Sequence, residues 1–311
     1  MVVDARVLAD VLDRLRPEVP GVEVDGWAPS VQGAVGKVVG VRDGGGSPHV
    51  LKIYPATARR RRDTEVLALR LLADVPGIVG PRPVGYGQLD GPAGVAFLLM
   101  TRLDGVRWAD RRAELDPART TALTREVGRA LRRLHTVAGR QFGDLLEDGA
   151  RWPTAWDRVA ARTGDLIAEH LRAGGPSRLA DRVRRFVERH RQAVASGPGP
   201  MLCHNDFVGS NLLVPATGEP RLCGVVDLER ASWNDPLSDL AQTRLHVRQH
   251  RPADTVALVE GYGVGGPDEH RRLDVHEVLH ALAERNWVAY DRPAGWRESI
   301  AALDVLLTGR T

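Results

Sequence analysis

The segment around Asp206 holds the residues whose types and spacing best fit a chemical reaction. It begins at His204, reaches Asn211 five positions after Asp206, and is followed by Asp227 after another strand-like run. Phosphoryl transfer needs a carboxylate that orients the attacking hydroxyl, and oxygen ligands for the Mg²⁺ that neutralises the phosphates. The spacing therefore predicts Asp206 as the catalytic base and Asn211 with Asp227 as the Mg²⁺ ligands.

Strand-like runs flank this loop on both sides. Residues 201–203 lead into it, residues 212–214 lead out, and residues 221–226 return the chain to Asp227 after a turn. Such a hairpin would place Asn211 beside Asp227 at neighbouring strand ends, within reach of one ion. The simpler alternative is a hydrogen-bonded loop with no catalytic role.

These residues resemble the aminoglycoside phosphotransferase family, which includes choline kinase-like small-molecule kinases. His204, Asp206 and Asn211 meet its H-x-D-x-x-x-x-N pattern, and residues 233–241 meet its W-x-D-P-x-x-D-L-A segment. The resemblance implies that Asp239, in this segment, braces the catalytic loop together with His204. It also implies the bilobal α+β fold of protein kinases, with an N-terminal antiparallel sheet lobe carrying one main helix, a hinge and a mostly α-helical C-terminal lobe.

Glu229 follows Asp227 by two positions, where protein kinases carry the glycine of their D-F-G motif. Two roles remain open for this side chain. It would contact a second metal ion or its water, or it would be a carboxylate at a helix entry or on the surface.

Lysine is rare in this chain, since almost all of the 43 basic residues are arginine. A retained lysine therefore indicates a place that needs a compact ammonium on a flexible stem. Lys52 lies in the alternating strand 49–54, where the resemblance places the lysine that holds the α- and β-phosphates. Glu65, in the amphipathic helix 57–75, is its predicted partner, and Asp63 is the nearest rival. Alternatively, Glu65 would pair locally with an arginine.

Two further segments are expected to contact the nucleotide. The glycine-rich residues 30–40 could fold over the phosphates through backbone amides, although they do not form a Walker A loop. The apolar run 95–100 leads into Thr101, Arg102 and Leu103, the expected hinge that binds the purine. ATP is the expected nucleotide, and the sequence does not distinguish it from GTP. The hinge divides the chain into residues 1–103, the nucleotide-binding lobe, and 104–311, the catalytic and substrate-binding lobe.

Hydrophobic periodicity gives the remaining elements. The predicted helices are residues 5–15, 57–75, 118–137, 152–172, 177–195, 239–251, 255–261 and 271–289. The predicted strands of the first lobe are residues 22–27, 38–42, 49–54, 82–89 and 95–100.

Composition limits the class of protein. The 311 residues, 43% of them hydrophobic, suffice for one catalytic unit of two lobes. A net charge of +3 does not single out nucleic acid, and no apolar run is long enough to span a membrane, so a cytoplasmic location is expected. Cys203 and Cys223 are expected to be buried thiols rather than a disulfide. The basic run 59–62 is expected to be a solvated helix face.

Three other functions compete with a small-molecule kinase. His276, Glu277 and His280 match H-E-x-x-H, which would suit a zinc hydrolase, but Asn286 stands where a third histidine ligand would follow. A protein kinase needs an activation segment, and Trp233 follows Asp227 too closely to leave room for one. A nucleotide-binding pseudokinase is disfavoured because every chemical position is filled.

The acceptor is expected to be a small hydroxylated molecule. The resemblance favours an aminoglycoside or another hydroxylated antibiotic, and the alternative is a metabolic kinase acting on an amino alcohol, sugar or sugar amine. A polycationic acceptor would require a site rich in carboxylates. The predicted substrate contacts are Asp157, Glu277, Trp287 and Asp291. The sequence predicts no oligomeric state.

Overall fold

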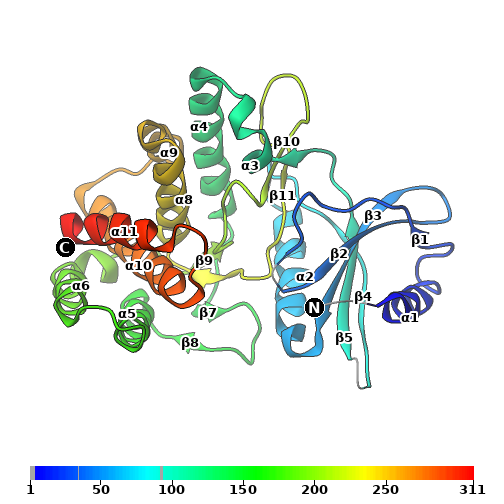
Figure 1. The fold of residues 1–311 in the computed structure, drawn as a ribbon, viewed down its shortest axis with the longest axis horizontal. Coiled ribbons are helices and arrows are strands. Elements are labelled where there is room, and N and C mark those ends of the chain that lie inside the picture. The colour runs from blue at the N-terminus through cyan, green and yellow to red at the C-terminus, as the bar shows by residue number, and fades with distance from the viewer. Residues whose placement is uncertain (1–3, 34, 92–93) are drawn as a thin grey trace.

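The computed structural model describes residues 4–33, 35–91 and 94–311. An antiparallel sheet lies at one end of the molecule, and helices dominate the other end (Figure 1). The sheet has the strand order β1-β2-β3-β5-β4. Its strands are β1 (Glu23–Val24), β2 (Lys37–Arg42), β3 (Pro48–Pro55), β4 (Pro83–Leu89) and β5 (Val95–Thr101).

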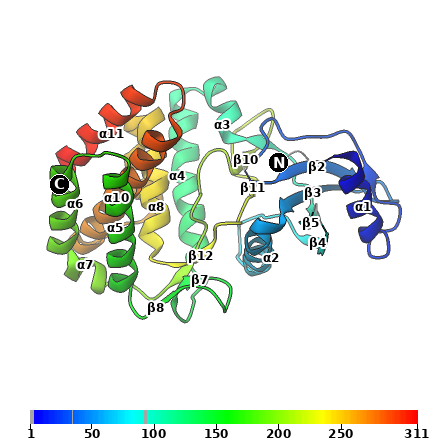
Figure 2. The same cartoon turned by 60° about the horizontal axis from the view of Figure 1, so that its bottom comes forward.

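Helices cover both faces of this sheet. On one face α1 (Ala5–Leu15) buries Leu12 and Leu15 against a cluster that includes Ile53. On the other face, α2 (Arg59–Ala73) lies between the sheet and the C-terminal lobe (Figures 1 and 2). Leu69 and Leu72 of α2 share one core cluster with Leu98 of β5. Covering both faces explains why β5 is a continuous apolar run, with every residue buried up to the final Thr101.

The C-terminal lobe is mostly helical. Its helices are α3 (Trp108–Arg111), α4 (Pro117–Leu134), α5 (Ala155–Arg172), α6 (Ser177–Arg189), α7 (Arg191–Ala195), α8 (Pro236–His250), α9 (Thr255–Tyr262), α10 (Pro267–Asp291) and α11 (Trp296–Arg310). Together with the first sheet this is the expected bilobal α+β architecture. The exact lobe boundary between residues 103 and 104 stays a prediction.

Two small sheets carry the loops of the site. One has the order β11-β10-β6, from β6 (Val106–Arg107), β10 (Leu212–Val214) and β11 (Gly224–Val225). The other has the order β8-β7-β12-β9, from β7 (Phe142–Asp144), β8 (Arg151–Trp152), β9 (Met201–Cys203) and β12 (Ser232–Asn234). Leu212 pairs with Val225, so the predicted hairpin between residues 212 and 226 forms, with a shorter second strand than expected.

Several predicted boundaries differ from the structure. The helix expected at 152–172 begins at Ala155, because Thr154 caps it and Trp152 belongs to β8. The helix expected at 177–195 is interrupted at His190 and forms α6 and α7. Helix α11 was not expected.

No helix among the described residues is long and apolar enough to cross a membrane. Both cysteines are free thiols, as expected. Cys203 is fully buried, whereas Cys223 is only half-buried and so differs from the expected buried thiol.

Candidate active site

The catalytic loop connects β9 to β10 and contains Asp206. The backbone of Asn205 is left-handed, with φ of 58°, and this conformation turns the chain sharply before Asp206. The side-chain amide of Asn211 donates to the backbone oxygen of Asp206 at 2.9 Å and to its carboxylate at 3.0 Å. The predicted base and the predicted metal ligand are therefore in direct contact across the loop.

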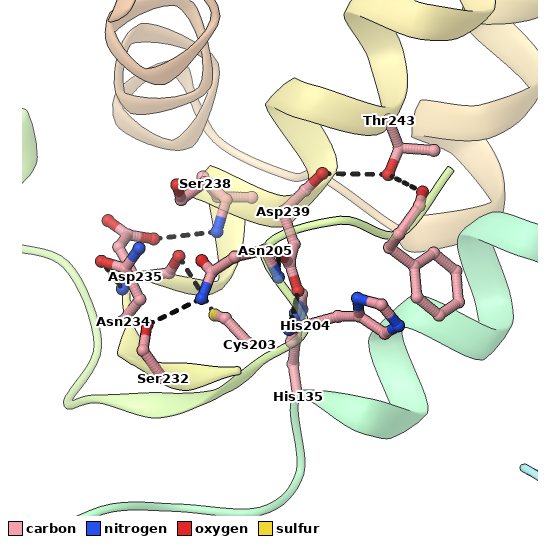
Figure 3. Close-up of polar contacts among 12 residues, drawn as sticks. His135, Cys203, His204, Asn205, Ser232, Asn234, Asp235, Ser238, Asp239 and Thr243 are labelled. Carbon is pink, nitrogen blue, oxygen red and sulfur yellow. Dashed lines mark hydrogen bonds and ion pairs between the residues drawn. The ribbon is translucent and has the colours of Figure 1, made fainter. Parts of the chain in front are cut away.

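Asp239 braces this loop from the first turn of α8 (Figure 3). Its two carboxylate oxygens accept the backbone N–H groups of His204 and Asn205, both at 2.6 Å, and His135 Nε2 lies 3.3 Å away. Burial alone would raise the pKa of Asp239, but the bond with His135 and the other donors hold it below its usual value. One turn further along α8, Thr243 donates to the backbone oxygen of Phe207 at 2.8 Å.

Asp227 lies immediately beyond the hairpin. The N–H of Val226 donates to the backbone oxygen of Asn211 at 3.0 Å, and His204 Nε2 lies 3.0 Å from the oxygen of Val226. These contacts place Asp227 beside the end of the catalytic loop, as the spacing predicted. Its backbone is also left-handed, with φ of 67°. Left-handed non-glycine residues are often found at functional sites.

Lys52 reaches three carboxylates from β3. Its Nζ lies 2.9 Å from Glu65, 2.5 Å from Asp227 and 2.9 Å from Glu229. The predicted pairing with Glu65 is present, while Asp63 pairs instead with Arg62. Tyr54, two residues after Lys52 on the same face of the strand, donates its hydroxyl to Glu65.

The charges of this cluster depend on one another. Burial would lower the pKa of Lys52, but the carboxylates, Glu65 first, raise it well above its usual value. Burial raises the pKa of Glu65, which is 1% exposed, and Lys52 partly offsets that rise. For Asp227 the attraction of Lys52 outweighs burial and lowers the pKa. Among the residues that the structure describes, the Lys52 ammonium is the only cation that contacts all three acids.

The expected hinge has two of its three backbone amides engaged within the protein. Thr101 N–H donates to the backbone oxygen of Arg82 at 2.9 Å, and Arg102 N–H donates to that of Pro48 at 3.3 Å. The Arg102 side chain pairs with Asp25 at 2.7 Å. The side chain of Leu103 lies over Gly224, next to the catalytic hairpin. In the glycine-rich segment 30–40, residue 34 lies outside the described residues.

Comparison with known families identifies the chain. A family model described as the phosphotransferase enzyme family (APH) matches residues 31–275. The chain belongs to this family. The phosphotransferase-family chain is 34% identical to an aminoglycoside 3'-phosphotransferase of Escherichia coli over 85 residues. This segment is 27% of the chain and 30% of that relative, so the chain matches less than a third of the relative's length.

Solved phosphotransferase structures share the fold over nearly the whole chain. The aminoglycoside phosphotransferase APH(4)-Ia has a TM-score of 0.68 at 17% identity, covering 97% of this chain and 98% of that chain. A putative fructosamine-3-kinase from Thermobifida fusca has a TM-score of 0.67 at 17% identity, covering 96% of this chain and 98% of that chain. At this identity the similarity establishes the fold, which confirms the predicted kinase-like architecture.

The structure excludes one of the two roles left open for Glu229 and bears out the expectation for the basic run 59–62 only in part. Glu229 is neither at a helix entry nor on the surface, because it is 9% exposed and pairs with Lys52 and Arg61. The basic run 59–62 is a solvated face in part, because Arg59, Arg60 and Arg61 keep exposed side chains whereas Arg62 is buried. Arg60 contacts Asp148 at 2.7 Å, Arg61 contacts Glu229, and the buried Arg62 donates to the backbone oxygen of Gly87. Two of these arginines therefore join α2 to the C-terminal lobe.

The predicted substrate residues are not brought together with Asp206. Glu277 is fully buried and pairs with three arginines, which are Arg244, Arg248 and Arg310. Asp157 caps α5 by accepting from Thr154 at 2.7 Å. Trp287 and Asp291 are exposed on the last turns of α10, and no contact among the described residues joins them to the catalytic loop.

The H-E-x-x-H segment has a structural explanation. His276 lies 3.3 Å from Asp235, and His280 Nε2 lies 3.1 Å from the hydroxyl of Ser238. The arginines already engage Glu277, which would have to activate a zinc-bound water. Among the described residues, groups able to hold a metal are His135 with Cys203 and Asp239, and Glu65 with Asp227 and Glu229. The zinc motif is in neither group, so the zinc hydrolase alternative is not supported.

Sequence reasoning missed three residues that support the site. Tyr54 could have been found from the sequence, because residues two apart on a β-strand point to the same face of the sheet, and Tyr54 follows Lys52 by two positions on β3. Thr243 could also have been found, four residues after Asp239 on a helix. His135 gave no signal, since it meets Asp239 only through the packing of α4 beside α8.

Proposed function

We propose that this chain transfers the γ-phosphoryl group of ATP, or of GTP, to a hydroxyl group of a small molecule. Asp206 orients the hydroxyl and takes its proton as the new P–O bond forms. The bond between the γ-phosphorus and the β–γ bridging oxygen breaks, and the nucleoside diphosphate leaves with that oxygen. Most of the acceleration comes from alignment and charge stabilisation.

The observation that carries the proposal is the position of Lys52. Its ammonium lies between the buried Glu65 and Asp227, and Asp227 in turn lies beside the loop of Asp206. Such a lysine can neutralise nucleotide phosphates once they enter, while Glu65 holds it in place. The Leu103 backbone amide, next to two engaged amides, is our candidate for the bond to the purine.

The residues present fit Mg²⁺. Asn211 uses its Nδ2 to contact Asp206, which leaves its amide oxygen for another partner. Asp227 has a side chain that is 37% exposed, so it is accessible from the nucleotide side. Both are oxygen donors, the type that Mg²⁺ prefers. When bound there, Mg²⁺ would neutralise charge on the transferring phosphates.

Relatives of the same fold support a nucleotide and a hydroxylated acceptor. A thermostable mutant of APH(4)-Ia has been solved with ADP and hygromycin B, and APH(2")-IIia with GDP and kanamycin. The fructosamine-3-kinase neighbour supports the metabolic alternative to an antibiotic. We therefore define the acceptor here only as a small hydroxylated molecule.

Release of ADP in the presence of Mg²⁺ and ATP, measured across hydroxylated antibiotics, amino alcohols, sugars and sugar amines, tests the proposal. We expect one compound class to stimulate turnover in the wild type, and Asp206→Asn to abolish the stimulation while it still binds nucleotide. Wild-type rates in Asp206→Asn would refute the assigned base. Absence of Mg²⁺-dependent nucleotide binding would refute the function altogether.

A further inference from the structure

Arg112 is a guanidinium without a partner next to the catalytic loop. It begins the short helix η2 (Arg112–Glu114), directly after α3, and stacks on the buried ring of Trp108 at 5.4 Å. Within the described ranges it makes no ion pair and no side-chain hydrogen bond. Burial lowers the pKa of Arg112, and no carboxylate offsets this effect. An uncompensated, partly buried arginine is costly unless a ligand supplies the missing anion.

Contacts with Gly209 fix the position of Arg112. A Cβ atom added to Gly209 would lie 2.7 Å from Arg112 Nη2, and Ala109 N–H donates to the backbone oxygen of Gly209 at 2.9 Å. Gly209 lies between Asp206 and Asn211 in the catalytic loop. The guanidinium therefore lies against the loop that carries both the base and the metal ligand.

Two histidines of α8 extend this basic surface. Asp239 and Thr243 contact the catalytic loop, and His246 and His250 follow at helical spacing along the same side of α8. Arg112 and His250 line one small pocket, which Arg251 and its partner Asp254 also line. Burial lowers the pKa of both histidines, so that each offers a neutral N–H at physiological pH. Arg112, His246 and His250 are called the Arg112 cluster below.

Two carboxylates near this cluster are paired with arginines, since Asp254 pairs with Arg251 at 2.6 Å and Asp110 pairs with Arg107. Glu284 accepts from the neutral amide of Gln249 at 2.6 Å, so it keeps its charge. The Glu277 carboxylate, which was expected to bind a cationic acceptor, is enclosed by arginines. A polycationic acceptor would thus meet an unpaired arginine with few free carboxylates to bind its amines.

We propose that the acceptor carries a carboxylate or phosphate group in addition to its reactive hydroxyl, and that the Arg112 cluster binds this anion. The planar guanidinium suits bidentate binding of either group, and the histidine N–H groups would add donors. This inference rests on the proposed function and names its substrate class. Arg112 acts here as a specificity residue, because the proton and the metal are held elsewhere.

Turnover on size-matched acceptors tests the inference. The neutral and cationic probes are glucose, glucosamine and the polycation kanamycin. The anionic probes are gluconate and glucose 6-phosphate, which separate binding of a carboxylate from binding of a phosphate. We expect the anionic probes to be preferred. Arg112→Gln should lose roughly 10- to 100-fold in kcat/KM for them, mainly through KM, as expected for a charge-assisted contact. Arg119→Gln, which removes an exposed arginine of α4, is the matched control and should behave as wild type.

Binding of gluconate and sulfate to protein saturated with Mg²⁺ and AMP-PNP gives a second readout that does not depend on turnover. Calorimetry should detect binding to the wild type and to Arg119→Gln, and a loss of about tenfold or more in Arg112→Gln. Equal affinity in Arg112→Gln, no binding to the wild type, or faster turnover of kanamycin than of any anionic probe would overturn the inference. Failure of AMP-PNP itself to bind would instead count against the proposed function.

Discussion

Lys52 contacts more oppositely charged groups than any other side chain described in the site. It contacts Glu65, Asp227 and Glu229, which come from a helix of one lobe and from the segment after β11 in the other. These three carboxylates repel one another, and in the absence of nucleotide the Lys52 ammonium offsets that repulsion. A bound nucleotide would compete with Asp227 for the same ammonium. Binding of nucleotide is therefore expected to rearrange this contact.

Replacement of Lys52 by alanine should reduce both stability and nucleotide affinity. The buried Glu65 would lose its ion-pair partner, which typically costs about 3 kcal/mol. The free energy of unfolding, measured with urea, tests the first effect, and nucleotide titration tests the second. Lys37→Ala, which removes the only other lysine, is the matched control and should change the stability by less than about 0.5 kcal/mol. An equal loss in both variants would contradict this account of the cluster.

Lys52→Arg should not restore nucleotide binding. A planar guanidinium is wider than an ammonium and cannot rotate its donors among three carboxylates. Recovery of wild-type affinity in this variant would show that charge alone suffices at the position.

At the level of elements, α4 and α9 approach unusually closely because each contributes a glycine. A Cβ atom on Gly128 would lie 2.3 Å from the backbone oxygen of Leu258, and one on Gly261 would lie 2.1 Å from that of Arg125. Backbone atoms cannot move aside as a flexible side chain can. The close packing anchors α4, which carries His135 near its C-terminal end and so supports Asp239.

Gly128→Ala should therefore destabilise the protein despite the better helix propensity of alanine. Propensity favours alanine by about 1 kcal/mol, but overpacking against backbone costs more, so we expect a net loss of about 2 kcal/mol. Gly164→Ala in α5 is the matched control, since its Cβ would meet no atom within 4 Å. It should stabilise by up to about 1 kcal/mol. Thermal unfolding of the two variants should show shifts of opposite sign.

The sequence predicted those elements that have their own periodicity. Helix α1 and strands β2, β3 and β5 lie where alternation or a 3.6-residue period placed them. The short strands β7, β8 and β12 were not predicted, because two or three residues carry no detectable period and form only by pairing with β9 or with one another. The predicted acceptor residues do not meet at the catalytic loop for a similar reason. Whether Glu277 faces a substrate or three arginines depends on contacts that are distant in sequence.

At the level of the whole molecule, ion pairs link the two lobes near the residues proposed to bind the nucleotide. Arg60 meets Asp148, Arg61 meets Glu229, and Lys52 meets Asp227. The first pair is largely exposed, and such pairs contribute little stability. The pair between Lys52 and Asp227 involves residues proposed to act on the nucleotide, which would couple lobe position to occupancy of the site.

Acid stability should depend on His280, which contacts Ser238 between α8 and α10. Burial, together with nearby His276, lowers the pKa of His280 to about 3. Between about pH 6.5 and pH 3 the unfolded chain binds a proton at this histidine while the folded protein does not. The free energy of unfolding therefore decreases as the pH is lowered through this range. His280→Gln should reduce that slope between pH 6.5 and about pH 4 by as much as 1 kcal/mol per pH unit.

Urea unfolding at several pH values measures this slope. His270→Gln, which removes an exposed imidazole on α10, is the control and should follow the wild-type profile. Identical pH profiles for His280→Gln and wild type would show that His280 is protonated in the folded protein.

Transfer of ³²P from γ-labelled ATP to an acceptor is the most direct test of the central claim. The wild type with Mg²⁺ should place the label on the acceptor, and Asp206→Asn should do so at least about a hundredfold more slowly with similar nucleotide affinity. Label that appears only as inorganic phosphate under all conditions, or transfer that survives unchanged in Asp206→Asn, would contradict a phosphotransferase that uses Asp206 as its base.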